Sequence, residues 1–133
     1  MVRRPRAAGG GCVIAVVFVA GALGAVLRYV VDGVVQERWG RSFPLGTFVV
    51  NISGALMLGL LTGFLLGHSS APAVLKYGAG VGFVGAYTTF STPMFESFRL
   101  LREGAWRMAA LNTLGSTACG MAVAAVGLAV GRG

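Results

Sequence analysis

Ala86-Tyr87-Thr88-Thr89-Phe90-Ser91-Thr92-Pro93 is the stretch of sequence that decides the fold of this chain. It places five hydroxyl side chains, an aromatic ring and a proline inside a run, Tyr77 to Phe95, that has no charged residue. Within a bilayer, a helix break survives only where the freed backbone groups are buried in protein or line a polar cavity. An apolar segment interrupted in this way indicates an ion or substrate site.

Composition places the whole chain in a membrane. Of the 133 residues 56% are hydrophobic and only 11% are charged, whereas about a quarter are charged in a typical soluble domain. The charge-free blocks are 7–27, 42–75, 77–95 and 108–131, and a spanning helix needs about 20 apolar residues. We therefore predict an all-α membrane protein, a single domain over 1–133. It has four transmembrane helices near 10–31, 44–67, 73–98 and 105–130, the third broken mid-span.

Two other interpretations of the composition are weaker. Arg3, Arg4 and Arg6 precede an apolar run, as in a secretory signal peptide, but three more apolar spans follow in place of a soluble domain. The net charge of +7 could suggest nucleic acid, yet the basic residues lie between the spans, where membrane anchoring explains them. We expect no nucleic-acid partner and, with no catalytic constellation in view, no enzyme.

The basic residues scarcely favour one orientation. Four spans put both termini on one side, with five basic residues there: Arg3, Arg4, Arg6, Lys76 and Arg132. The other side has six: Arg28, Arg38, Arg41, Arg99, Arg102 and Arg107. Since Lys/Arg bias sets orientation, this near balance predicts insertion both ways and an antiparallel, dual-topology dimer. The alternative is that the N-terminal arginines dominate and one orientation prevails.

Polar residues form stripes on two of the predicted spans. Thr47 and Asn51 are four residues apart and share a helix face, as do Asn112 and Ser116. A buried amide is costly unless it is paired or lines a path, and its NH₂ can donate to an anion. The stripes favour an anion path, with an interhelical hydrogen bond as the open alternative for Asn51.

Three further side chains have two interpretations each. The positive ring edge of Phe90 could face an anion, or the ring could simply pack. Arg28 could attract anions into a vestibule or extend to the lipid headgroups. Glu96 and Arg99, three apart near the end of the third span, predict a local ion pair.

Three motifs closely resemble the bacterial fluoride channel family (CrcB/Fluc). They are Gly21-Ala-Leu-Gly-Ala-Val-Leu-Arg28-Tyr29, Pro44-Leu-Gly-Thr-Phe-Val-Val-Asn51-Ile-Ser-Gly54, and Gly82-Phe-Val-Gly85-Ala-Tyr-Thr-Thr-Phe-Ser-Thr92 followed by Glu96. The resemblance extends over all four helices.

This resemblance implies a fluoride-selective channel of the bacterial inner (plasma) membrane, which lets accumulated fluoride leak passively from the cytoplasm. It implies a homodimer, or a heterodimer with a paralogous subunit, surrounded by membrane lipid. A structural sodium ion at the dimer centre is expected on the backbone carbonyls of Gly85 and Thr88. The anion path, combining the family positions with the hydroxyl cluster and stripes, is expected at Asn51, Thr47, Phe90, Ser91, Thr92, Ser116 and Asn112, with Arg28 in the vestibule.

The chain departs from the family pattern at two positions. Pro93 stands where the family has a second pore phenylalanine, and Gly120 replaces a frequent hydroxyl. Since proline removes a backbone donor, it is also expected to lengthen the break. An alternative function is therefore a weakly conducting subunit that needs a paralogous partner. Less favoured is a small multidrug resistance type exporter, because such a protein needs a carboxylate embedded in the membrane and the first span has none.

Overall fold

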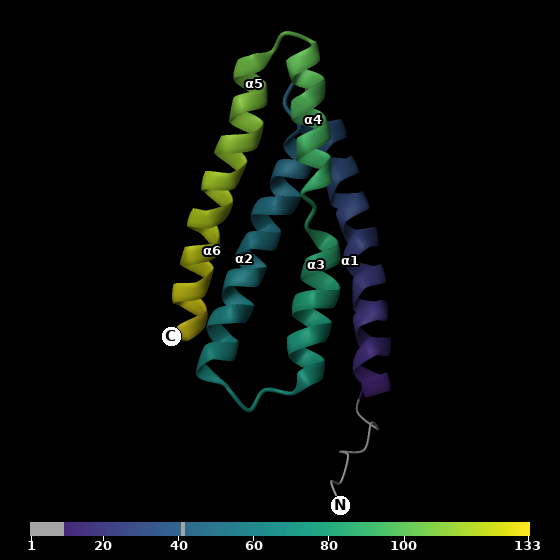
Figure 1. Cartoon of the computed structure of the whole chain (residues 1–133), viewed down its shortest axis with the longest axis vertical. Helices are drawn as coiled ribbons and strands as arrows, with labels where there is room; N and C mark the ends of the chain where they lie inside the picture. Colours follow the sequence, from purple (N-terminus) through teal and green to yellow (C-terminus); the bar gives the residue numbers. More distant parts are fainter. Residues whose placement is uncertain (1–9, 41) are drawn as a thin grey trace, which may run out of the picture.

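The structure is a computed structural model that describes residues 10–40 and 42–133, and its elements are helical (Figure 1). The elements are α1 (Gly10–Trp39), α2 (Leu45–Gly67), η1 (Leu75–Val84), α3 (Gly85–Tyr87), α4 (Ser91–Arg102), α5 (Trp106–Ala110), η2 (Leu111–Gly115) and α6 (Ser116–Arg132). The two η segments are π-helical. The described residues form four rods: α1, α2, a third rod of η1, α3 and, after an interruption, α4, and a fourth of α5, η2 and α6.

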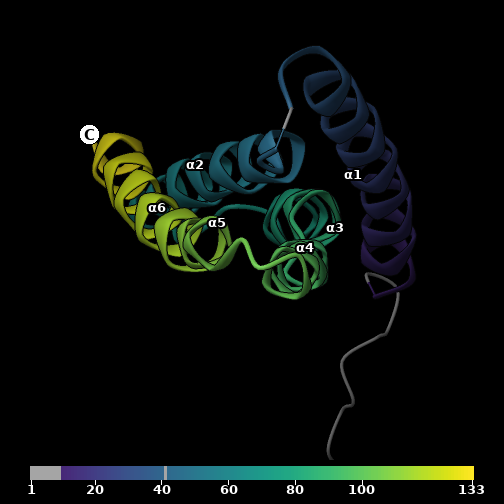
Figure 2. The same cartoon turned by 90° about the horizontal axis from the view of Figure 1, so that it is seen from above.

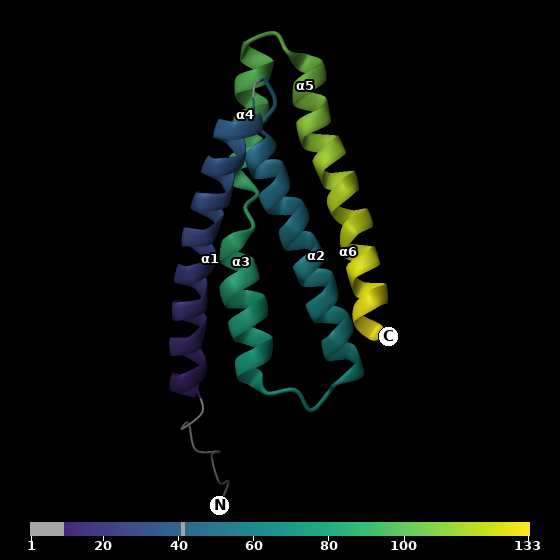
Figure 3. The same cartoon turned by 180° about the vertical axis from the view of Figure 1, so that it is seen from behind.

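The rods form an elongated bundle. The start of α1, the α2–η1 connection and the end of α6 lie at one end, and the α4–α5 turn lies at the other (Figures 1 and 3). Seen from above, α2 lies between the rod of α1 and that of α5 and α6, with α3 and α4 to one side (Figure 2). The main packing partners are α2 with α6, and α1 with η1.

Glycines make the closest helix contacts. A Cβ atom added to Gly127 of α6 would lie 2.7 Å from the Leu56 carbonyl oxygen of α2. One added to Gly82 of η1 would lie 2.8 Å from the Val17 carbonyl oxygen of α1. Small residues allow this backbone approach in membrane bundles.

Few apolar side chains are buried within a single copy. Among the described residues the buried apolar side chains are Val50, Val84, Tyr87, Leu100 and Ala109. Large apolar side chains such as Phe18, Leu114 and Val130 are 65–75% exposed. This surface is suited to lipid or to a partner chain and unsuited to water.

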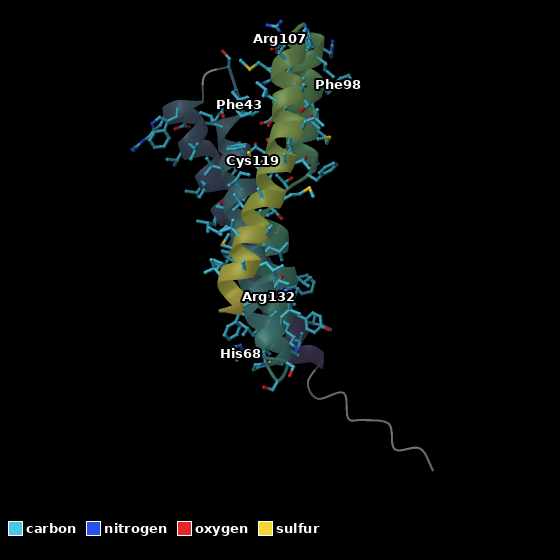
Figure 4. The ribbon with its side chains drawn as sticks, turned by 90° about the vertical axis from the view of Figure 1, so that its left-hand side faces the viewer. Phe43, His68, Phe98, Arg107, Cys119 and Arg132 are labelled. Carbon is cyan, nitrogen blue, oxygen red and sulfur yellow. The ribbon has the colours of Figure 1, made fainter. Side chains whose placement is uncertain are left out.

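Three helices of the described chain are long and apolar enough to cross a membrane: Gly10–Trp39, Leu45–Gly67 and Trp106–Arg132. Arg107 and Arg132 lie near opposite ends of the bundle, with Cys119 between them (Figure 4). The protein is therefore a multi-pass membrane protein, as the composition predicts.

The rod from Leu75 to Arg102 is not one continuous helix. Helical backbone ends at Tyr87, Thr88 is extended (φ −77°, ψ 157°), and α4 begins at Ser91. One difference from the predicted spans is in α1, which continues to Trp39 rather than ending near residue 31. Its additional turns carry Asp32 and Gln36 into the bundle.

Candidate functional site

The interruption between α3 and α4 is held by α2. The backbone N–H of Thr89 donates to Oδ1 of Asn51 over 3.0 Å. The backbone N–H and the side-chain hydroxyl of Thr88 both donate to the Val84 carbonyl, each over 3.0 Å. Asn51 thus satisfies a backbone donor freed by the break, and its NH₂ group has no acceptor within residues 10–40 and 42–133.

Beside this break lies a cavity of about 150 Å³. Its lining residues come from α2, the break, α4, η2 and α6: Asn51, Thr89, Phe90, Pro93, Met94, Asn112, Thr113, Ser116 and Thr117. None of them carries a formal charge. Amide and hydroxyl donors with an aromatic ring give a neutral site that can hydrogen-bond to a small ion.

Ser116 contributes a free hydroxyl to this cavity. Its Oγ atom is buried and has no hydrogen-bond partner in the described part of the chain. Buried polar groups are normally paired, so an unpaired hydroxyl in a cavity suits a ligand. Phe90, on another wall, is 74% exposed, so the cavity adjoins the surface of this copy.

Asn112 also lines the cavity, but its amide is engaged by protein. Its Nδ2 atom donates to the Pro93 carbonyl over 3.0 Å and to Ser97 Oγ over 2.9 Å. An NH₂ group has two hydrogens, so donation to an anion would break one of these bonds. Asn112, 1% exposed, ties α4 to η2.

Thr47 lies outside the cavity, in a different environment. It is 1% exposed, and its Oγ1 lies 3.4 Å from Asp32 Oδ1 and 3.2 Å from Glu96 Oε1. The predicted ion pair between Glu96 and Arg99 is wrong. The turn of α4 points Glu96 toward α2, whereas Arg99 points outward and pairs with Glu103 over 3.7 Å.

The other predicted residues surround the cavity without lining it. Ser91 and Thr92 each lie 3.4 Å, hydroxyl to hydroxyl, from Thr89, and Arg28 is half-buried on α1. The structure therefore brings together Asn51, Phe90, Asn112 and Ser116. It does not bring Thr47, Ser91, Thr92 or Arg28 to the same cavity.

Pro93 does not lengthen the break, contrary to the expectation from its missing donor. It is the third residue of α4, which begins at Ser91. The N–H groups of a first helical turn have no intrahelical acceptor, so proline costs no hydrogen bond there. Pro93 is buried and lines the cavity.

A metal ion could be held here only by neutral oxygen atoms. The described chain contains no group of three His, Cys, Asp or Glu residues suited to a metal. At the break, however, the carbonyls of Gly85 and Thr88 accept no hydrogen bond from the described residues, and Gly85 is exposed. Free carbonyl oxygens of this kind can replace the water around a cation.

These features define a class: a small, multi-pass, all-helical membrane protein with a charge-free, donor-lined cavity beside an interrupted helix. Such a protein has the parts of a channel for a small ion, and the described residues contain no obvious catalytic group at the cavity.

Comparison with known proteins identifies the family. The profile of the CrcB-like family (camphor resistance, CrcB) matches residues 15–128. A fluoride-specific ion channel FluC of Maridesulfovibrio salexigens is 46% identical over 112 residues, 84% of this chain and 89% of its own. FluC 2 of Mycolicibacterium paratuberculosis is 50% identical over 107 residues, 80% of this chain and 84% of its own. FluC 1 of Symbiobacterium thermophilum is 47% identical over 116 residues, 86% of this chain and 94% of its own. The chain belongs to the CrcB-like family, as the resemblance of its motifs predicts.

Proposed function

We propose that this protein is a fluoride-selective channel that lets fluoride leave the cytoplasm passively. The observation that carries the proposal is the cavity in which the Asn51 amide and the Ser116 hydroxyl both have unused donors. Fluoride is small and strongly hydrated, so a selective site must supply close donors in place of water. The names of the relatives, fluoride-specific ion channels, point to the same ion.

The conducting unit we propose is an antiparallel dimer. The cavity of one copy adjoins its surface at Phe90, so a second copy can cover it and complete a continuous path. The near balance of basic residues, five against six, supports insertion in both orientations.

A structural sodium ion is part of the same proposal. The free carbonyls of Gly85 and Thr88 fit a hard cation, and a dimer would present both sets at its centre. When bound, the ion would supply positive charge between the α3–α4 interruptions of the two copies. Replacing sodium with a large organic cation is expected to weaken the dimer, which size-exclusion chromatography in detergent would show.

The central experiment is a fluoride efflux assay. Purified protein in liposomes loaded with fluoride is expected to release it, recorded with a fluoride-selective electrode, while chloride stays inside. Empty liposomes provide the baseline. Release of both halides at equal rates, or of neither, would contradict the proposal.

The second candidate function is a subunit that conducts weakly until it pairs with a paralogue. Pro93 supports this function, because the cavity wall has proline where the family has phenylalanine. Gly120 supports it too, because there is room for a side chain at that position: a Cβ atom added to Gly120 would lie 4.0 Å from Ile52 Cδ1. Two of the relatives have numbered names, FluC 1 and FluC 2, which are expected where an organism has more than one such chain. Robust efflux from this chain alone would exclude an obligate partner, and a rise in efflux for Pro93→Phe would support one.

A further inference from the structure

Three helices meet at the hydroxyl of Thr47, which lies one turn of α2 from Asn51. Asp32 reaches it from α1 and Glu96 reaches it from α4, over 3.4 and 3.2 Å. We call these two residues the carboxylate pair. The hydroxyl between them is almost completely buried, so water does not separate the two contacts.

The approach of Asp32 is built into the packing of α1 against α2. A Cβ atom on Gly46 would lie 3.0 Å from the Asp32 carbonyl carbon and closer still to Oδ1. One turn further along α1, Gln36 Oε1 accepts a hydrogen bond from the Gly46 N–H over 3.2 Å. The first turn of α2 has no side-chain cap of its own, so α1 supplies its acceptors. A neutral side chain would serve this structural purpose equally well.

The number of protons distinguishes an acid at position 32 from a neutral residue. A threonine hydroxyl has one proton, so two ionised carboxylates cannot both receive it. In addition, Glu96 Oε2 is buried with no hydrogen-bond partner in the part of the chain that the structure describes. If one carboxyl is protonated, it donates to Thr47 Oγ1, and Thr47 donates to the other. The two carboxyl groups therefore compete for one hydroxyl proton.

Few other charges face the pair. On α1, Arg28 lies one turn before Asp32, and Glu37 is exposed. Helix α2 has no charged residue. On α4, Arg99 pairs with Glu103. Within the described chain no lysine or arginine lies at ion-pair distance from Asp32 or Glu96. The proton state of the pair therefore decides how much negative charge lies beside the anion path.

We propose that Asp32 is a positioning residue for anion conduction: it competes with Glu96 for the Thr47 proton and so makes fluoride flux depend on pH. The inference rests on the proposed function. When the pair holds a proton, the hydrogen bonds through Thr47 are complete and the pair carries one negative charge. When that proton is lost, the pair carries two, and fluoride passes more slowly.

The test is fluoride efflux from liposomes at a series of pH values between about pH 6 and about pH 9. The variant is Asp32→Asn, which keeps an oxygen acceptor for Thr47 and cannot ionise. The matched control is Glu37→Gln, the same change at an exposed position of the same helix. Empty liposomes at each pH correct for leakage of hydrogen fluoride through the lipid.

We expect efflux through the unchanged protein and Glu37→Gln to fall on the order of tenfold across this range, because one unit charge is added about Thr47, one turn of α2 from the cavity residue Asn51. Efflux through Asp32→Asn is expected to stay nearly constant. A purely structural role would change the rate of Asp32→Asn by the same factor at every pH, and that result would overturn the proposal.

Infrared spectroscopy tests the same inference without conduction. At neutral pH the unchanged protein should show the carbonyl stretch of a protonated carboxylic acid, and Asp32→Asn should lack it. Absence of the band from the unchanged protein would overturn the proposal. If the unchanged protein carries no fluoride at any pH, the proposed function fails while the band still reports on the pair. Glu96→Gln, which also leaves a single acid, is the second variant should Asp32→Asn fail to assemble, and it too should lack the band.

Discussion

Asn51 and Thr47 lie one turn apart on α2, yet they meet opposite chemistry. Asn51 faces a backbone donor and a cavity lined by neutral groups, and its amide NH₂ is free. Thr47 faces two carboxyl groups, which repel anions when they are ionised. The difference comes from the neighbouring helices. The interruption before α4 faces Asn51, whereas Glu96 of α4 and Asp32 of α1 face Thr47. A shared helix face therefore does not define a shared site.

The largest expected effect comes from placing a carboxylate in the uncharged cavity. Asn51→Asp keeps the acceptor for the Thr89 N–H but replaces the free NH₂ with a charged oxygen. We expect fluoride efflux to fall by about a hundredfold, since like charges brought together cost several kcal/mol. Ser70→Asp, which adds a carboxylate at an exposed position of the α2–η1 connection outside the cavity, should conduct nearly normally. Unchanged efflux from Asn51→Asp would remove Asn51 from the path.

Asn112 tests whether a residue that lines the cavity acts through the fold. Asn112→Ala removes two hydrogen bonds, one to the Pro93 carbonyl and one to Ser97 Oγ, so we expect the free energy of unfolding to fall by roughly 2 kcal/mol. Thermal unfolding in detergent measures this. The control is Leu114→Ala, at a position 70% exposed in a single copy. Full stability with lost conduction would instead favour direct donation from Asn112 to the anion.

Phe90 tests the contribution of the ring edge. Phe90→Ile retains apolar volume and removes the aromatic quadrupole, so efflux should fall by about tenfold. Phe98→Ile alters an aromatic of α4 that does not line the cavity and should have little effect. Equal rates for the two variants would mean that Phe90 only packs.

The smallest expected effect concerns the free hydroxyl. Ser116→Ala removes one unpaired donor, and we expect about a fivefold loss of efflux, in line with a single hydrogen bond. The control is Thr117→Val, because the Thr117 hydroxyl already donates to the Thr113 carbonyl over 2.7 Å. A greater loss from the control would show that packing along η2 and α6 matters more than the donor.

The sequence predicts the helical, membrane-spanning class well, because charge-free blocks and motif order are local properties. It also predicts three residues that line the cavity: Asn51 and Ser116 from i, i+4 polar pairs in apolar spans, and Phe90 from its ring edge and its family position. The carboxylate pair was missed because the first span was ended at residue 31, before Asp32, and because Glu96 was assigned to Arg99. The π-helical turns, which change the phase of a helix, had no recognised signal in the sequence.

That Pro93 breaks no helical hydrogen bond follows only from the first residue of α4, which the sequence does not specify. One residue of difference in the helix start decides whether a proline breaks a hydrogen bond or replaces an N–H with no acceptor. The environment of Thr47 likewise depends on where three separate helices meet, which spacing on one helix does not specify.

The small set of apolar side chains buried in one copy has a consequence for measurements of stability. In the proposed dimer, association covers part of the apolar surface that one copy exposes. Unfolding of that dimer is coupled to dissociation, so by mass action its apparent melting temperature rises with the ratio of protein to detergent. A melting temperature reported for this protein therefore has meaning only together with that ratio.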